Sequence, residues 1–231
     1  MESLEKSFIK FCKKNKYEKN ENQIKLIKSL SKFNLSRNKI ADFFFSSNRK
    51  LGFYLYGDVG VGKTMVLNFF YKSLKIPKQR SHFNEFMVDF HNFRHRFKNK
   101  DNSIKKFVRN LKRKCELIYF DEFQITNIVD AMILGKLFET IFEENIKIII
   151  TTNTKLNDLY RGGLQRDQFL PFISIIEKSS VQKELLLNDD YRQKNNEKIQ
   201  NFFYPLNEKT SFKLNQKFRE FTRNKNKETK I

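Results

Sequence analysis

The sequence predicts an α/β protein built on a parallel β-sheet, and two stretches carry that prediction. Residues 51–71 place a short apolar segment before a glycine-rich loop and a helix-forming segment after it. Residues 117–122 are four apolar residues followed by two acids, which is how a strand buried on both faces of a parallel sheet reads. Because ligands bind at the carboxyl ends of the strands in such sheets, both stretches put polar groups where a site would form.

Before the loop, residues 22–33 predict an amphipathic helix, because apolar residues recur at three- and four-residue spacing. The apolar stripe comprises Ile24, Leu26, Ile27, Leu30 and Phe33. Gln23 lies at the start of this helix and has two interpretations. Its amide could read the edge of an adenine, or it could cap the helix.

The glycine-rich loop satisfies the phosphate-binding pattern G-x-x-x-x-G-K-[ST] in full. It comprises Gly57, Asp58, Val59, Gly60, Val61, Gly62, Lys63 and Thr64. Glycines let the backbone turn tightly and point N–H groups at an anion, and the N-terminus of the following helix adds partial positive charge. Lys63 is expected to reach the β- and γ-phosphates, and Thr64 to hold Mg²⁺. The alternative is a glycine-rich turn before a core helix.

Residues 81–97 predict a strand that leads into a helix, with phenylalanines recurring on one helical face. His91 and His95 have the i, i+4 spacing that can present two imidazoles to one metal. No cysteine or third histidine joins them at ligand spacing, so surface or groove histidines are the favoured interpretation. The basic run over residues 98–114 predicts a solvated helix face, with a partner surface as the alternative.

The two acids at the end of the 117–120 strand predict catalytic and metal-binding roles. Asp121 would stand beside the phosphate loop and help hold Mg²⁺, directly or through water. Glu122 is placed to orient and deprotonate an attacking water. A strand followed by an acidic turn is the alternative, but a string of this kind 58 residues after Lys63 (121 − 63), with a helix between, favours the functional interpretation.

Further along, a helix over residues 127–142 is predicted, capped by Asn127 with Asp130 as a capping-box partner. Residues 147–152 predict another buried strand that ends at Asn153. This amide could hydrogen-bond a γ-phosphate or the attacking water, or belong to an ordinary strand-end turn.

The last predicted elements follow residues 158–172, which contain Arg161 and Arg166. An arginine at a subunit surface can complete a neighbour's active site as an arginine finger, and the alternative is an ordinary ion-paired arginine. Residues 181–187 predict a final strand.

The composition narrows the class of protein. The formal net charge is +20 over 231 residues, but the basic residues are spread rather than clustered. Compositional bias is therefore favoured over a dedicated nucleic-acid surface. Cys12 and Cys115 lie far apart without metal-ligand spacing, and no apolar run approaches a membrane span. With no secretory signal, these features predict a cytoplasmic protein.

Several longer strings together resemble the ZapE-type cell-division ATPases and their mitochondrial relatives, the lactation-elevated ATPases. The strings are GFYLYGDVGVGKTMVLNFFY, HFNEFM, IYFDEFQITNIVDAMILGKLFE, TTN and DLYRGGLQRDQFLPFI. The resemblance covers about residues 20–192. It implies a P-loop NTPase of the AAA+ type, with a five-stranded parallel sheet, helices on both faces and a nucleotide at a subunit interface.

The resemblance also implies ATP and Mg²⁺ as cofactors and assigns roles by position. The family's functional residues fall on Gln23, Lys63, Thr64, Asp121, Glu122, Asn153 and Arg166. Lys63 and Thr64 would hold the phosphates and metal, with Asp121 as a second metal carboxylate. Glu122 would be the catalytic acid, Asn153 the sensor and Arg166 the arginine finger. Gln23 would lie near the nucleotide.

Two departures from the family pattern stand out. Asn127 occupies a position where the family usually has Asp. After Arg192 the sequence shows no convincing helical lid, which in the family supplies a second sensor arginine. We therefore expect an N-terminal helical extension over residues 1–50, an AAA+ core over 51–192 and a truncated polar segment over 193–231.

The expected function is ATP hydrolysis that remodels a protein client, with FtsZ polymers at the bacterial division site as the client that the resemblance implies. A homo-oligomer that assembles on ATP binding is expected. The alternatives are a nucleic-acid-associated AAA+ protein such as a helicase loader, and a catalytically weak nucleotide-binding fragment.

Overall fold

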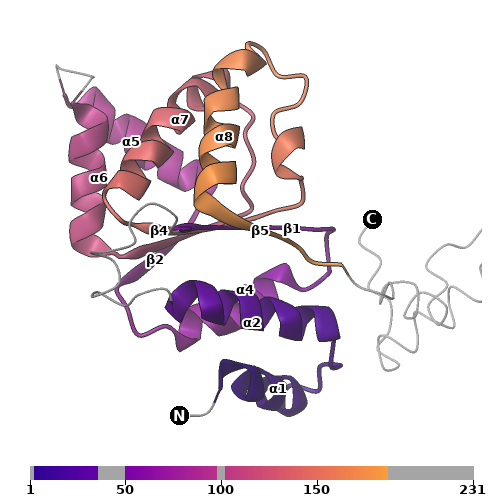
Figure 1. Ribbon diagram of the computed structural model, residues 1–231. Helices are drawn as coiled ribbons and strands as arrows, with labels where there is room; N and C mark the ends of the chain where they lie inside the picture. Colours follow the sequence, from indigo (N-terminus) through magenta and orange to yellow (C-terminus); the bar gives the residue numbers. More distant parts are fainter. Residues whose placement is uncertain (1–2, 36–49, 98–101, 187–231) are drawn as a thin grey trace, which may run out of the picture. The chain divides into compact units, whose positions relative to one another are not determined.

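A five-stranded parallel β-sheet forms the centre of the protein (Figure 1). Its strands are β1 (Gly52–Tyr56), β2 (Lys78–His82), β3 (Leu117–Asp121), β4 (Lys147–Thr152) and β5 (Ser180–Glu184). They lie in the order β2-β3-β4-β1-β5, so β1 is flanked by β4 and β5. The predicted five-stranded parallel sheet with helices on both faces is confirmed.

The computed structural model describes residues 3–35, 50–97 and 102–186. These residues lie in a unit that runs from Met1 to Leu187. The expected segment 193–231 and the boundary at residue 192 lie outside the described residues. No described helix is both long enough and apolar enough to cross a membrane.

Helices cover both faces of the sheet (Figure 1). One face carries α1 (Leu4–Lys14), α2 (Glu21–Leu35) and α4 (Lys63–Ser73). The other carries α5 (Phe83–His95), α6 (Ser103–Lys114), α7 (Ile128–Glu143) and α8 (Leu170–Ser179). Two short 3₁₀ turns, η2 (Leu156–Asp158) and η3 (Arg166–Gln168), lie between β4 and α8.

Strand alternation divides the core into two hydrophobic clusters. On β1, Phe53 and Leu55 face the α2 and α4 side, whereas Tyr54 belongs to the cluster on the α5–α8 side. The second cluster is rich in phenylalanine, and its Phe138 and Phe172 rings meet almost perpendicularly with centroids 5.0 Å apart. Edge-to-face packing of this kind explains how the core uses so many phenylalanines.

Lysines at or next to the starts of strands cap the carboxyl ends of helices. At the end of α4, Lys78 Nζ donates to the carbonyls of Tyr71 and Leu74, each at 2.5 Å. At the end of α2, the buried Lys147 Nζ donates to the carbonyls of Phe33 and Asn34, at 3.1 and 3.2 Å. These contacts satisfy carbonyls that have no partner within the helix and place positive charge at the negative end of its dipole.

Candidate functional site

A pocket of about 500 Å³ opens at the carboxyl edge of the sheet, where β1, β3 and β4 end. Its walls include eight of the predicted residues: Val59, Gly60, Gly62, Lys63, Thr64, Asp121, Glu122 and Asn153. The glycine-rich loop between β1 and α4 forms one wall with the start of α4, and the last residues of β3 and β4 with the residues that follow them form the others. Residues that lie up to 94 positions apart in the chain (153 − 59) therefore share one cavity.

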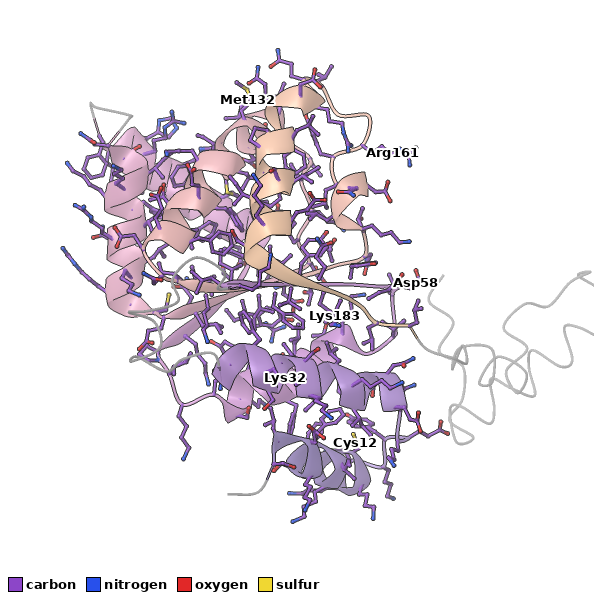
Figure 2. All side chains as sticks on the ribbon, viewed as in Figure 1. Cys12, Lys32, Asp58, Met132, Arg161 and Lys183 are labelled. Carbon is purple, nitrogen blue, oxygen red and sulfur yellow. The ribbon has the colours of Figure 1, made fainter. Side chains whose placement is uncertain are left out.

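The loop glycines adopt conformations that side chains disfavour. Gly60 and Gly62 have φ values of 88° and 89°, in the left-handed region. Gly62 directly precedes the first residue of α4, so the free N–H groups of that helix begin at the pocket. At Gly57, a Cβ atom would lie 2.4 Å from the carbonyl oxygen of Leu185. Figure 2 shows Asp58 next in the loop, at the edge of the sheet where β1 ends.

Lys63 is buried, and its ammonium group is held by three oxygens. Its Nζ donates to the carbonyls of Gly57 and Asp58 and to Oδ1 of Asn153, at 2.7, 2.8 and 2.8 Å. Burial lowers the pKa of Lys63, and the nearby carboxylates of Asp58 and Asp121 oppose that shift. The amine therefore joins the loop to the end of β4.

Asp121 accepts hydrogen bonds from three side chains on three strands. Tyr119 and Thr151 donate their hydroxyls to Oδ1, at 3.1 and 2.8 Å. Arg80 on β2 forms an ion pair with Oδ2. Burial would raise the pKa of Asp121, but the hydrogen bonds from Arg80, Thr151 and Tyr119 outweigh it and hold the pKa below its ordinary value. The carboxylate is therefore ionised at neutral pH.

Glu122 follows with a backbone that is unusual for a residue other than glycine. Its φ is 54°, in the left-handed region, and its side chain is exposed. Its N–H donates to Oγ1 of Thr151 at 3.4 Å, and the next N–H, of Phe123, donates to the carbonyl of Thr151 at 2.8 Å. The end of β4 thus fixes the turn that carries Glu122 at the pocket.

Gln23 and Arg166 are absent from the pocket walls. Gln23 is buried, and its Nε2 donates to the carbonyl of Val61 in the loop at 3.1 Å. The cap of α2 is Asn20, whose Oδ1 accepts from the N–H groups of Asn22 and Gln23 at 2.9 and 3.2 Å. The interpretation of Gln23 as the cap of this helix is therefore wrong, because Asn20 caps it.

Arg166 lies in η3 and is engaged with its own loop. It donates to the carbonyls of Leu159 and Asn157, at 3.2 and 2.6 Å. The nearby Arg161 is exposed and pairs with Asp158 at 3.3 Å, and Figure 2 shows it pointing away from the ribbon. Neither arginine reaches the pocket of its own chain.

The histidine pair does not converge on a metal. His91 Nε2 lies 2.6 Å from Oδ1 of Asp130, a contact that joins α5 to α7. Across the described part of the chain, no three His, Cys, Asp or Glu side chains gather into a metal site.

The predicted N-cap of α7 is confirmed, because Oδ1 of Asn127 accepts the N–H of Val129 at 2.8 Å.

Arg80, Thr151 and Asn68 are residues of the site that sequence reasoning missed. Arg80 donates through its second nitrogen to Oδ1 of Asn68 on α4 at 2.7 Å. The signal for Arg80 was the polar strand KQRSH, which pairs with the strand that ends in Asp121, because the planar guanidinium of an arginine suits a neighbouring carboxylate.

The oxygens of the pocket fit a magnesium ion that also binds a phosphate. A threonine hydroxyl and an ionised carboxylate are hard ligands, and Mg²⁺ commonly uses one or two protein oxygens together with phosphates and water. The buried ammonium group and the free N–H groups of α4 suit phosphate oxygens.

Comparison with known proteins points to the same chemistry. The family model described as AFG1-like ATPase matches residues 7–231, which is most of the chain. Cell division protein ZapE of Escherichia coli strain K12 is 34% identical over 160 residues, covering 69% of this chain and 43% of that protein. Lactation elevated protein 1 homolog B of Danio rerio is 38% identical over 139 residues, covering 55% of this chain and 28% of that protein.

Among solved structures, AMPPCP-bound DnaA from Aquifex aeolicus aligns with a TM-score of 0.51 and 20% identity. The alignment covers 89% of this chain and 61% of that chain. This likeness is one of fold. The chain spans less than half the length of the two curated relatives above.

Proposed function

The chain belongs to the AFG1-like ATPase family, and from that premise we propose that it binds ATP with Mg²⁺ and hydrolyses the nucleotide. One observation carries the proposal. Lys63, Thr64, Asp121, Glu122 and Asn153 line a single pocket at the carboxyl edge of the sheet. Together they supply a phosphate cradle, two metal ligands, a base and an amide.

The phosphate loop binds and orients the triphosphate. Its N–H groups and the first turn of α4 bind phosphate oxygens, and Lys63 exchanges its contacts with the Gly57 and Asp58 carbonyls for the β- and γ-phosphates. Gln23, which already holds Val61 of the loop, contributes to the nucleotide side of the same site.

Thr64 and Asp121 are the residues that would hold magnesium. Bound there, the ion would offset the negative charge that develops on the phosphate during hydrolysis. Asp121 serves because its lowered pKa keeps it ionised.

Glu122 orients the attacking water and takes its proton, and Asn153 hydrogen-bonds the γ-phosphate or that water. Arg166 completes the site from a neighbouring subunit as an arginine finger, since it does not reach the pocket of its own chain. This role predicts a homo-oligomer that forms on ATP binding.

Steady-state ATP hydrolysis and nucleotide binding by wild type, Glu122→Gln and Lys63→Ala test the roles assigned to Glu122 and Lys63. Glu122→Gln is expected to bind ATP but to lose at least about 100-fold in turnover, because it removes the base. Lys63→Ala is expected to lose ATP binding itself. A wild-type rate no higher than that of Glu122→Gln would overturn the enzymatic function, and equal nucleotide affinity in wild type and Lys63→Ala would overturn the phosphate-loop assignment.

Mass measurement in solution tests the subunit arrangement. Glu122→Gln with ATP is expected to form an oligomer. Adding Arg166→Ala to the same chain is expected to leave ATP binding intact. The single variant Arg166→Ala is expected to bind ATP but to lose turnover. A protein that stays monomeric with ATP at every concentration while hydrolysing it would overturn the arginine finger.

The client is proposed by family likeness. The Escherichia coli relative is named a cell division protein, and we extend that role to a cytoplasmic ATPase that remodels a protein polymer at the division site. Purified FtsZ polymers are the first client to test, by sedimentation with ATP. Polymer mass that changes with ATP in wild type but not in Glu122→Gln supports the client, and no change in either removes it.

A nucleic-acid-associated function is the second candidate, and α6 is the observation that favours it. This helix carries six basic residues and no acidic one. A salt titration of single-stranded DNA binding decides between the candidates. Affinity that falls steeply with salt favours nucleic acid, because phosphate contacts release counterions, and no binding at low salt excludes it.

A further inference from the structure

Arg80 makes a bridge between the metal carboxylate and the phosphate-loop helix. One guanidinium nitrogen pairs with Oδ2 of Asp121 at the end of β3, and the other donates to Oδ1 of Asn68 on α4 at 2.7 Å. The guanidinium also lies over the ring of Tyr119, with its central carbon 5.1 Å from the centroid. Three contacts from three directions fix the position of this cation beside Asp121.

The two oxygens of Asp121 are held differently. Tyr119 and Thr151 donate to Oδ1, so two neutral hydroxyls already fix the orientation of the carboxylate. Arg80 occupies Oδ2 with a full positive charge. Removing Arg80 would therefore change the electrostatics of Asp121 much more than its orientation.

We propose that Arg80 is a positioning residue that competes with magnesium for Asp121, and that it thereby sets the magnesium concentration at which the site takes up a nucleotide. This inference rests on the proposed function. A guanidinium and a divalent ion on the same carboxylate repel each other, and Asp121 between them is almost fully buried although the Arg80 side chain is 37% exposed. When the metal arrives, Arg80 gives up Oδ2 and keeps Asn68.

The test is a magnesium titration of the binding of a fluorescent ATP analogue, mant-ATP, followed by anisotropy. In Arg80→Gln, the half-saturating magnesium concentration is expected to fall roughly tenfold, because one charge beside the metal is lost. Arg80→Lys keeps the charge and is expected to restore the wild-type requirement. Arg109→Gln is the matched control. Arg109 lies on α6, is exposed and does not line the pocket, and it also pairs with a carboxylate, that of Glu144, at 3.4 Å.

An unchanged or higher magnesium requirement in Arg80→Gln overturns the inference while leaving the nucleotide site in place. Wild-type protein that binds mant-ATP at no magnesium concentration overturns the proposed function, and the inference with it. Thermal unfolding of each variant without nucleotide confirms that all are folded.

Should Arg80→Gln fail to fold, the wild-type protein still decides. The Nε–H resonance of Arg80, assigned by its loss in Arg80→Lys, is expected to move when Mg²⁺ is titrated into protein mixed with an excess of mant-ATP. A resonance that stays in place through the titration would show that Arg80 does not leave Asp121.

Discussion

Asp121 shows how one buried carboxylate draws polar partners from neighbouring strands. It lies at the end of β3, between Thr151 on β4 and Arg80 on β2, and it is nearly inaccessible to solvent. A buried charge of this kind is tolerated only where hydrogen bonds and an ion pair replace water. The three donors are therefore as much a part of the site as the acid.

Replacing Thr151 by Val tests that dependence. The substitution keeps the shape of the side chain but removes the hydroxyl that donates to Asp121 at 2.8 Å, so the free energy of unfolding is expected to fall by about 1–3 kcal/mol. Urea denaturation measures it. Thr140→Val is the control, because the buried Thr140 hydroxyl bonds only a helix carbonyl, that of Lys136, and its loss is expected to cost less. Equal losses in the two variants would contradict the special role of Asp121.

Glu122 illustrates a residue whose backbone conformation opposes stability. A left-handed conformation costs a residue with a Cβ on the order of 1 kcal/mol, and glycine adopts it freely. Glu122→Gly is therefore expected to match or exceed wild type in its free energy of unfolding while losing ATP turnover. Glu122→Gln keeps the Cβ and serves as the comparison, with the stability of wild type. A clear loss of stability in Glu122→Gly alone would contradict the cost assigned to this conformation.

At the scale of elements, lysines that cap helices account for part of the strongly basic composition. Lys78 caps α4 and Lys147 caps α2, and Lys50 donates to the carbonyls of Glu177 and Lys178 at the end of α8. Each cation meets backbone carbonyls at the negative end of a helix dipole. These lysines thus have structural partners, so the net charge of +20 is not by itself a sign of nucleic-acid binding.

Lys147→Met tests the cap of α2. Methionine fills a similar volume but leaves the carbonyls of Phe33 and Asn34 without their donor, so a loss of about 1–3 kcal/mol in the free energy of unfolding is expected. Lys28→Met, at an exposed position of the same helix, is expected to change stability by less than about 0.5 kcal/mol. Chemical denaturation compares the two, and a stable Lys147→Met would show that water replaces the lysine.

The order of the elements could be predicted, because hydrophobic periodicity and the complete phosphate-loop pattern are each visible within a short stretch of the sequence. The helix predicted over residues 22–33 is α2 (Glu21–Leu35), and the strand predicted over 181–187 is β5, which begins one residue earlier. The cap at Asn20 was missed because the polar run before the helix offered several candidates. Only the fold shows which side chain reaches the first free N–H groups.

The contacts of Arg80 and His91 could not be predicted for a different reason. Arg80 meets Asp121 across 41 positions, and His91 meets Asp130 across 39. Such pairs depend on how strands and helices pack in space, whereas the i, i+4 spacing of His91 and His95 describes only a single helix. A neighbouring helix supplies the actual partner of His91.

At the scale of the whole unit, both hydrophobic clusters share one sheet. The buried strands alternate their side chains between the α1, α2 and α4 side and the α5–α8 side, so each cluster supports the same backbone. The helices near the N-terminus are thus part of the core, with Phe8 and Leu30 almost fully buried.

Shortening one buried side chain on each face of the sheet tests whether the two hydrophobic clusters unfold together. Leu30→Ala on α2 and Leu134→Ala on α7 each remove a fully buried leucine, so each is expected to lower the free energy of unfolding by about 2–5 kcal/mol. Near- and far-ultraviolet circular dichroism should follow one common transition in each variant. Two separated transitions, with only one moved by each substitution, would show that the faces unfold independently.

The strand order has a consequence for how copies of this protein can meet. In the described part of the chain, β2 and β5 are the outermost strands, and their sequences KQRSH and SVQKE are rich in charged and amide side chains. Strands of this kind discourage another polypeptide from extending the sheet by backbone pairing, which is a common route to fibrils. The homo-oligomer proposed above would then assemble through side chains on helices and loops rather than by extension of the sheet.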